Sequence, residues 1–241
     1  MGAQLAGRTV VVIGGSSGMG LETARLARSE GADVIITGRD PGRLSAAARE
    51  VGTTRTAAFD VTDQDALKRF FAELPGPIDH VMITAGGPHY GPLLEMDAAA
   101  VRDALSARIV TVLAVARNAA GRMRAGGTLL FMGSTGERRI GHGNGIAPAE
   151  MAALPPFAAA LALEMAPVRV NVIAPGFVDT PLSASLLGDQ LEERRNQLRA
   201  TLPIGRVVGP ADIAALAVHL MTNTAINGAT YDIDGGEQYT W

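Results

Sequence analysis

Seven short apolar runs, rich in valine and isoleucine, alternate along the chain with longer stretches in which apolar residues recur every three or four positions. Runs of β-branched residues favour strands buried on both faces, whereas the longer spacing favours amphipathic helices. Strands that alternate with helices over the whole length predict βαβ units. We therefore expect one doubly wound α/β domain, residues 1–241, with a parallel sheet of about seven strands. The predicted strands cover residues 10–13, 32–37, 56–59, 78–83, 127–132, 169–173 and 230–233.

The stretches between the strands carry recognisable helix signals. Pro41 at the first position of one helix and Thr62 as the N-terminal cap of another are typical helix starts. Prolines at 148, 155 and 156 are expected to interrupt the helix before the sixth strand, because proline lacks a backbone N–H. Residues 192–195 are expected to be the solvated face of a helix that precedes Pro203. The other predicted helices begin at residue 21 or cover residues 41–50, 63–73, 97–123 and 209–221.

Composition narrows the class of protein. Of the 241 residues, 47% are hydrophobic and only 4% aromatic, so the core is built from small and aliphatic side chains. A net charge of −3 argues against nucleic acid or an anionic membrane as a general partner. The chain has no cysteine, which excludes disulfides, thiolate catalysis and cysteine-ligated metals. No histidine or carboxylate cluster has metal-ligand spacing, so we expect no metal site.

The chain shows no export signal. Residues 1–8 lack the apolar core of a signal peptide. The apolar stretch 151–163 is too short to cross a bilayer and contains two prolines. We therefore expect a cytoplasmic protein that does not associate with membranes.

The first predicted strand ends in a glycine turn that opens a helix. The first turn of a helix offers unpaired N–H groups and the positive end of the helix dipole, and glycines let a pyrophosphate come close. A glycine turn can also be only a tight connection. Its position directly after a β-branched strand favours a dinucleotide site. The predicted pyrophosphate site consists of Gly14, Ser16, Ser17, Gly18, Met19 and Gly20.

Two residues at the exits of the second and third strands bear on the choice of nucleotide. In a doubly wound sheet the ligand lies beyond the carboxyl ends of the strands. Arg39 follows the second strand, where NAD-binding proteins carry a carboxylate for the ribose hydroxyl. A guanidinium matches a 2′-phosphate in charge and geometry, so NADP(H) is predicted over NAD. Asp60 either accepts a hydrogen bond from the adenine amino group, caps the next helix, or does both.

With these motifs the chain resembles the short-chain dehydrogenase/reductases from Arg8 to Gly236. The glycine turn matches that family's Thr-Gly-x3-Gly-x-Gly, with Ile13 in place of the threonine. The end of the chain, from Gly205-Arg206 to Gly235-Gly236, also matches. The resemblance implies NADP(H) as cofactor and a homodimer or homotetramer. It assigns further cofactor contacts to Asp60 and Val61, to Ala85, Gly86 and Gly87 after the fourth strand, and to Pro175, Gly176, Val178 and Thr180 after the sixth.

The catalytic residues of the family are only partly matched. Its members use Asn, Ser and a Tyr-x3-Lys pair, in which the tyrosine protonates the carbonyl oxygen as hydride arrives. Ser134 keeps the serine position, although it is also a typical turn serine at a strand exit. Ala147 and Met151 stand at the tyrosine and lysine positions, and Arg108 stands at about the asparagine position. The only lysine of the chain is Lys68, so no shift of alignment restores the pair.

Two hypotheses for the function follow. The first is an NADP(H)-dependent oxidoreductase that transfers hydride to a carbonyl, imine or enone-like small molecule. Ser134 then orients a substrate oxygen, and His89 or Tyr90, after the fourth strand, replaces the missing acid unless both residues only pack a lid. The second hypothesis is an NADP(H)-binding pseudoenzyme that acts as a sensor or a partner subunit.

Overall fold

All seven strands of the computed structural model belong to one parallel sheet. The model describes residues 3–144 and 146–240. The strands lie in the order β3-β2-β1-β4-β5-β6-β7, so the chain reverses direction across the sheet between β1 and β4. This confirms the doubly wound fold. The strand bounds are β1 Thr9–Ile13, β2 Asp33–Gly38, β3 Thr56–Ala58, β4 Ile78–Ile83, β5 Met123–Met132, β6 Arg169–Pro175 and β7 Thr230–Ile233.

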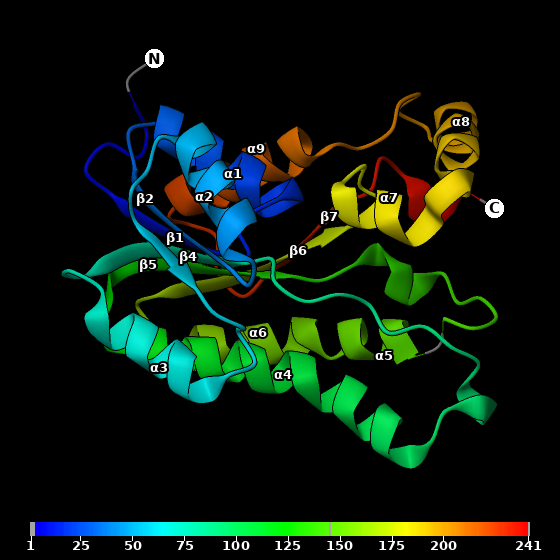
Figure 1. The fold of residues 1–241 in the computed structure, drawn as a ribbon, viewed down its shortest axis with the longest axis horizontal. Helices are drawn as coiled ribbons and strands as arrows, with labels where there is room; N and C mark the ends of the chain where they lie inside the picture. Colours follow the sequence, from blue (N-terminus) through cyan, green and yellow to red (C-terminus); the bar gives the residue numbers. More distant parts are fainter. Residues whose placement is uncertain (1–2, 145, 241) are drawn as a thin grey trace.

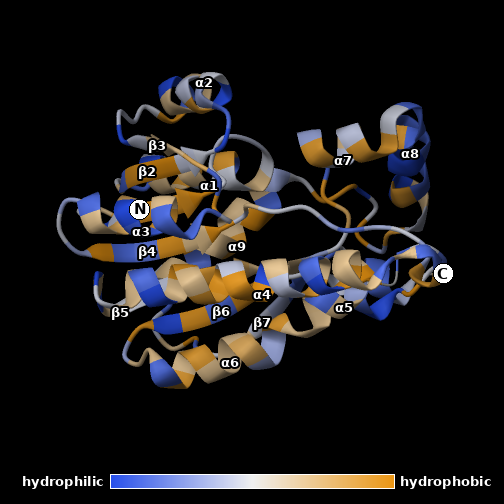
Figure 2. Cartoon of the chain, turned by 60° about the horizontal axis from the view of Figure 1, so that its bottom comes forward, coloured by the Kyte–Doolittle hydropathy of each residue, from blue (hydrophilic) through white to orange (hydrophobic). Residues whose placement is uncertain are grey.

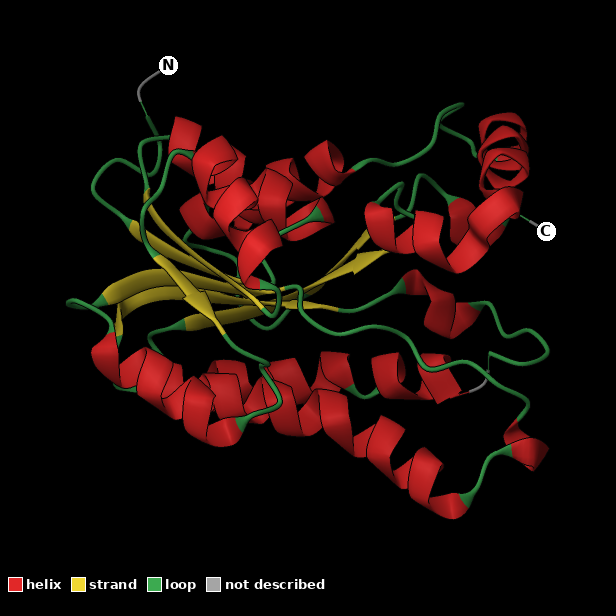
Figure 3. Cartoon of the chain, in the orientation of Figure 1, coloured by secondary structure: helices red, strands yellow, loops and turns green. Residues whose placement is uncertain are grey.

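Helices cover both faces of the sheet (Figure 1). One face carries α1 (Gly18–Ser29), α2 (Pro41–Val51) and α9 (Pro210–Thr222). The other face carries α3 (Gln64–Glu73), α4 (Ala98–Ala120), α5 (Ile146–Ala152) and α6 (Leu154–Glu164). The strand arrows in Figure 3 point toward the side where α7 (Pro181–Leu187) and α8 (Leu191–Thr201) lie. This side is therefore the ligand side of the sheet.

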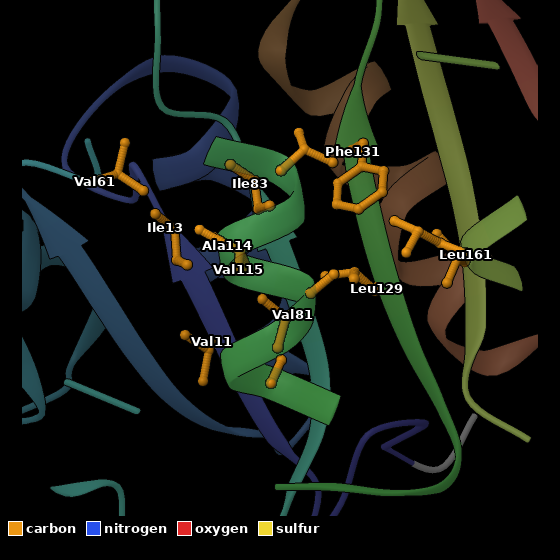
Figure 4. Packing of buried hydrophobic residues seen from close by; sticks show 14 of the residues in the cluster. Val11, Ile13, Val61, Val81, Ile83, Ala114, Val115, Leu129, Phe131 and Leu161 are labelled. Carbon is orange, nitrogen blue, oxygen red and sulfur yellow. The ribbon is translucent and has the colours of Figure 1, made fainter. Parts of the chain in front are cut away.

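The sheet separates two hydrophobic clusters, one under each helical layer. Valines and isoleucines alternate between the faces, so that Val11 and Ile13 of β1 belong to one cluster and Val10 and Val12 to the other. Figure 4 shows side chains of β1, β4 and β5 directed toward Ala114 and Val115 of α4. Figure 2 shows the contrast between the mainly hydrophobic strands and the largely hydrophilic α8. The predicted aliphatic core is thus present on both faces.

The structure corrects several predicted boundaries. Asp63, not Thr62, caps α3: its Oδ1 accepts hydrogen bonds from the N–H groups of Asp65 (3.1 Å) and Ala66 (3.0 Å). The helix predicted over 97–123 covers Ala98–Ala120, because Asp97 is its cap and Met123 already starts β5. The break before β6 is present, and Pro155 and Pro156 lie in the first turn of α6.

One helical stretch, residues 146–164, is long and apolar enough to cross a membrane by length and composition. It is divided into α5 and α6 at Ala153. In its most apolar window 44% of the residues are buried, and Leu154, Ala158 and Leu161 pack in the core beneath the sheet. We interpret it as core helices.

Candidate functional site

The glycine turn forms a close-packed cradle at the point where the sheet reverses direction. Gly14 has a positive φ of 94°, and a Cβ there would lie 2.7 Å from the backbone nitrogen of Ala85. A Cβ on Gly20 would lie 2.5 Å from Thr84 Oγ1. No side chain fits at either position, so glycine is required for the turn and α1 to pack this closely against the exit of β4. These two glycines join the exits of β1 and β4.

Helix α1 starts at Gly18 and presents its first N–H groups to this cradle. Ser17 is the residue before the helix, with an extended backbone and no side-chain hydrogen bond that caps the helix. Its hydroxyl is thus available to a ligand, together with the N–H groups of the first turn. Met19 differs from this pattern, because its side chain packs against the core and only its backbone remains at the site. The arrangement fits a pyrophosphate.

Arg39 and Asp60 lie next to each other in the predicted adenosine region, at the exits of β2 and β3. The Arg39 side chain is 76% exposed, and its Nη1 is 3.9 Å from Asp60 Oδ2, beyond hydrogen-bond distance. Its guanidinium is therefore free to meet a phosphate. Ser16 also lies here, since a Cβ on Gly38 would come within 2.8 Å of Ser16 Oγ.

Asp60 uses one carboxylate oxygen to close its own turn. Its Oδ1 accepts hydrogen bonds from Thr62 N (2.9 Å) and Thr62 Oγ1 (2.7 Å), and these bonds lower the pKa of Asp60. Of the two roles predicted for Asp60, the helix cap belongs to Asp63 instead. The adenine role stays a prediction for Oδ2. Val61 is buried in the core, so only its backbone is open to a ligand.

The exit of β6 packs against the glycine turn. A Cβ on Gly18 would lie 3.5 Å from Thr180 Cβ, which shows how closely the two segments approach. Thr180 caps α7 through a reciprocal pair of hydrogen bonds with Ser183. Pro175 ends β6, and Val178 is buried and pairs with Val208. A Cβ on Gly176 would come within 2.7 Å of Asp234 Cβ, so this turn is also built around glycine.

The exit of β4 carries Ala85, Gly86 and Gly87 past the cradle. Thr84 Oγ1 donates a hydrogen bond to the carbonyl oxygen of Gly14 at 3.0 Å, which fixes this strand end to the turn. The guanidinium of Arg108, from α4, lies against Gly86, and its Nη2 is 3.5 Å from the carbonyl oxygen of Gly87. The cofactor residues predicted on β1, β4 and β6 thus meet at one edge of the sheet.

Ser134 lies at the exit of β5 and caps the short helix η2 (Thr135–Arg138). Its Oγ accepts a hydrogen bond from Gly136 N at 2.9 Å. The turn role predicted for this serine is therefore present. A hydroxyl that accepts a bond still carries its own proton, so Ser134 can also donate to a substrate oxygen.

His89 and Arg108 both face the carboxylate of Glu150, although the three residues are distant in sequence. His89 Nδ1 is 2.9 Å from Glu150 Oε1, and Arg108 Nε is 3.5 Å from Glu150 Oε2. The Glu150 side chain is 1% exposed and the His89 side chain 49%. Tyr90 has no comparable partner among the described residues, and burial raises the pKa of its phenol.

Comparison with known proteins identifies the family. The family model described as enoyl-(acyl carrier protein) reductase matches residues 13–238. The chain belongs to the short-chain dehydrogenase/reductase family. It is similar to cis-4-hydroxycyclohexanecarboxylate dehydrogenase from Sinomonas cyclohexanicum, with 32% identity over 98% of both chains.

Solved structures of the family superimpose well on this chain. A short-chain dehydrogenase/reductase from Brucella melitensis has a TM-score of 0.88, with 26% identity over 98% of each chain. BdcA in complex with NADPH has a TM-score of 0.84 and 28% identity, and the match covers 96% of this chain and 95% of that one. Members of the family bind nicotinamide cofactors, and the cradle described above fits such a group.

Sequence reasoning did not single out Glu150, which the structure places beside His89 and Arg108. Glu150 is the only charged residue between positions 146 and 163. A single charge in an apolar helix needs a partner when it is buried, so the sequence contained a signal. The identity of its partners depends on how α4, α5 and the β4 exit come together.

The predicted solvated face of α8 is present at Glu192 and Glu193, whereas Arg194 and Arg195 are partly buried in contacts with other segments. Arg195 binds Asp179 through two hydrogen bonds, Nη2–Oδ1 at 2.8 Å and Nε–Oδ2 at 2.9 Å. Arg194 binds Glu237, a buried residue near the end of the chain. These residues hold α8 beside the exit of β6 and so help to shape the ligand side of the sheet.

Proposed function

We propose that this protein is an NADP(H)-dependent oxidoreductase with an atypical active site. The observation that carries the proposal is the cradle formed by Gly14 and Gly20 at the start of α1, where no side chain fits. The contact between Gly18 and Thr180 supports it, because it brings the expected nicotinamide segment to the same place. Both features lie where the strand order of the parallel sheet reverses, which is the place where nucleotides bind in such sheets.

NADP(H) rather than NAD is proposed because of Arg39. Its side chain is exposed and lies beyond hydrogen-bond distance of Asp60, so it is free to bind a 2′-phosphate. The NADPH complex of BdcA, a relative of similar fold, is consistent with this assignment.

The proposed reaction is hydride transfer to a carbonyl, imine or enone-like small molecule. A bound reduced nicotinamide supplies the hydride. Ser134 is proposed to orient the substrate oxygen, and His89 or Tyr90 to provide the proton. Ala147 and Met151, which we place at the family's tyrosine and lysine positions, are both buried and cannot donate one. The site is therefore expected to favour activated acceptors such as iminium ions, which take hydride without simultaneous protonation.

The experiment is NADPH oxidation against matched ketones, cyclic imines and enones. We expect imines to be reduced faster than ketones of the same carbon skeleton. Fast reduction of simple ketones would show that another acid, such as His89 or Tyr90, replaces the family's tyrosine.

The alternative is a pseudoenzyme that binds NADP(H) as a sensor or partner subunit. Met151 favours it, because this side chain is part of the hydrophobic core rather than the ligand surface. Tight NADPH binding without oxidation by any acceptor would support the alternative.

Assembly and location stay predictions. We propose a homodimer or homotetramer, because large apolar side chains on α4 and α6 are exposed, among them Val110 and Leu163. We also propose a cytoplasmic location, with no nucleic acid or membrane as partner.

A further inference from the structure

Glu150 lies at the centre of a group of three ionisable side chains from three separate elements. His89 comes from the loop after β4, Arg108 from α4 and Glu150 from α5. One carboxylate oxygen faces the imidazole at 2.9 Å, and the other faces the guanidinium at 3.5 Å. The backbone N–H of Gly91 donates to Gly143 O at 2.6 Å, which ties the His89 loop to the loop before α5. The loop that carries His89 is thus tied both to α5, through Glu150, and to the loop before α5.

Arg108 compensates the buried negative charge of Glu150. Its side chain is 14% exposed, and its Nε lies 3.5 Å from Glu150 Oε2 without a hydrogen-bond partner within the described residues. Burial lowers the pKa of Arg108, and the Glu150 carboxylate opposes this effect. The Arg108–Glu150 pair is therefore neutral overall, and His89 can gain or lose a proton without leaving a buried charge unpaired.

The carboxylate also determines which ring nitrogen of His89 carries the proton. An ionised carboxylate only accepts hydrogen bonds, so Nδ1 must be the donor. In the neutral ring Nε2 is then unprotonated, and in the charged ring Nε2–H is the free donor. The ring is half exposed while its Nδ1 edge is held by a buried side chain, so the exposed edge is the one that carries Nε2.

We propose that His89 is the proton donor of the proposed oxidoreductase, and that Glu150 and Arg108 are its positioning residues. The inference rests on the proposed function. Fixing the tautomer of a histidine through a buried carboxylate is a general way to build an acid or base. His89 would replace the missing phenol from another part of the chain, the exit of β4.

The reduced nicotinamide dinucleotide supplies the two electrons of the reduction, and His89 supplies the proton. The new C–H bond at the substrate carbon takes its hydride from the reduced nicotinamide dinucleotide, which is oxidised. The π-electron pair of the C=O or C=N bond moves to the heteroatom, and this atom takes the proton from His89 as the Nε2–H bond breaks. The substrate is reduced to an alcohol or amine, and solvent reprotonates the exposed imidazole edge.

The first test reads the tautomer without any cofactor. Nitrogen-15 NMR of the neutral histidines should show His89 protonated at Nδ1, with the signal assigned by its loss in His89→Gln. In Glu150→Gln the amide oxygen should face Arg108 and the amide NH2 should face Nδ1, which makes Nδ1 the acceptor and moves the proton to Nε2. Wild-type His89 protonated at Nε2 would overturn the proposal.

The second test compares kcat with NADPH affinity. His89→Gln should lower kcat about 100-fold and Glu150→Gln by a smaller factor, while the Kd for NADPH changes less than about twofold. Added imidazole should restore part of the activity of His89→Gly. His219→Gln, which changes an exposed histidine of α9, is the control and should behave as wild type.

The outcomes separate the two proposals. Turnover that is the same in wild type and His89→Gln would overturn the role of His89 and leave the oxidoreductase proposal standing. No turnover by wild type with any acceptor would overturn the oxidoreductase proposal, and the proton-donor role with it.

Discussion

At the scale of single residues, Arg39 is the simplest test of cofactor choice. Its guanidinium is exposed and has no ion-pair partner within 3.5 Å among the described residues. In Arg39→Ala we expect NADPH binding to weaken by about 1.5–3 kcal/mol, the typical value of a charge-assisted hydrogen bond, with NADH binding unchanged. Calorimetric titration with both nucleotides measures this. Arg49→Ala, an exposed arginine of the neighbouring α2, is the matched control. An equal loss for NADPH and NADH would disprove the 2′-phosphate role.

His80 makes the stability of the protein depend on pH. It lies buried in β4, and burial lowers its pKa from 6.5 to about 4, against the opposing effect of Asp79. Between these values the unfolded chain binds a proton that the folded protein does not, so stability falls as the pH decreases. The contribution is complete above pH 6.5 and amounts to about 3 kcal/mol. Urea unfolding from pH 7 to pH 4 should show a smaller decrease in His80→Leu than in wild type or in His219→Gln. Equal decreases would show that His80 does not titrate in this way.

At the scale of helices and strands, the predictions from the sequence were accurate where the residues of the element itself determine its structure. The β-branched runs became strands within a few residues of the expected bounds, because such side chains fit a sheet buried on both faces. The first residue of a helix could not be predicted where two neighbouring residues can both cap it. Thr62 and Asp63 are both good caps, and the choice depends on Asp60, whose carboxylate already binds Thr62.

Contacts between elements could not be predicted in the same way. Glu150 meets His89 across 61 positions of the chain, and only the packing of α5 beside the β4 exit brings them together. Arg195 and Asp179 are a second case, because their pairing depends on how α8 folds back over the end of β6. The cofactor residues were easier to predict, since the ligand edge of a parallel sheet follows from its topology alone.

The pair of Arg195 and Asp179 should control the local stability of α8. Both side chains are about one third exposed and solvent screens their interaction, so we expect Arg195→Ala to lower this local stability modestly. Amide hydrogen exchange in residues 191–201 should then be faster, with exchange in the sheet unchanged. Arg199→Ala is the control on the same helix, because Arg199 binds only residues of α8 itself. Equal exchange in the two variants would show that Asp179 does not hold the helix.

At the scale of the whole molecule, the helical layer formed by α3 to α6 differs from a purely solvent-facing surface. Leu105 and Val110 on α4 are 40% and 50% exposed, and Leu163 on α6 is 82% exposed. Single exposed apolar residues are common, but several on helices of one layer indicate a surface that another copy of the chain could cover. A stable interface buries about 800 Å² of each partner, so such an interface would have to extend over several helices of this layer.

Sedimentation at micromolar concentration should therefore show a homodimer or a homotetramer. The double variant Val110→Glu and Leu163→Glu places two charges in the expected interface, and unpaired buried charges oppose association strongly. We expect it to sediment as a smaller species than wild type while its circular dichroism stays unchanged. Leu186→Glu makes a similar change on α7, on the other side of the sheet, and should keep the wild-type assembly. A wild-type protein that sediments only as a monomer would refute the assembly, whereas loss of assembly in Leu186→Glu alone would place the interface at α7.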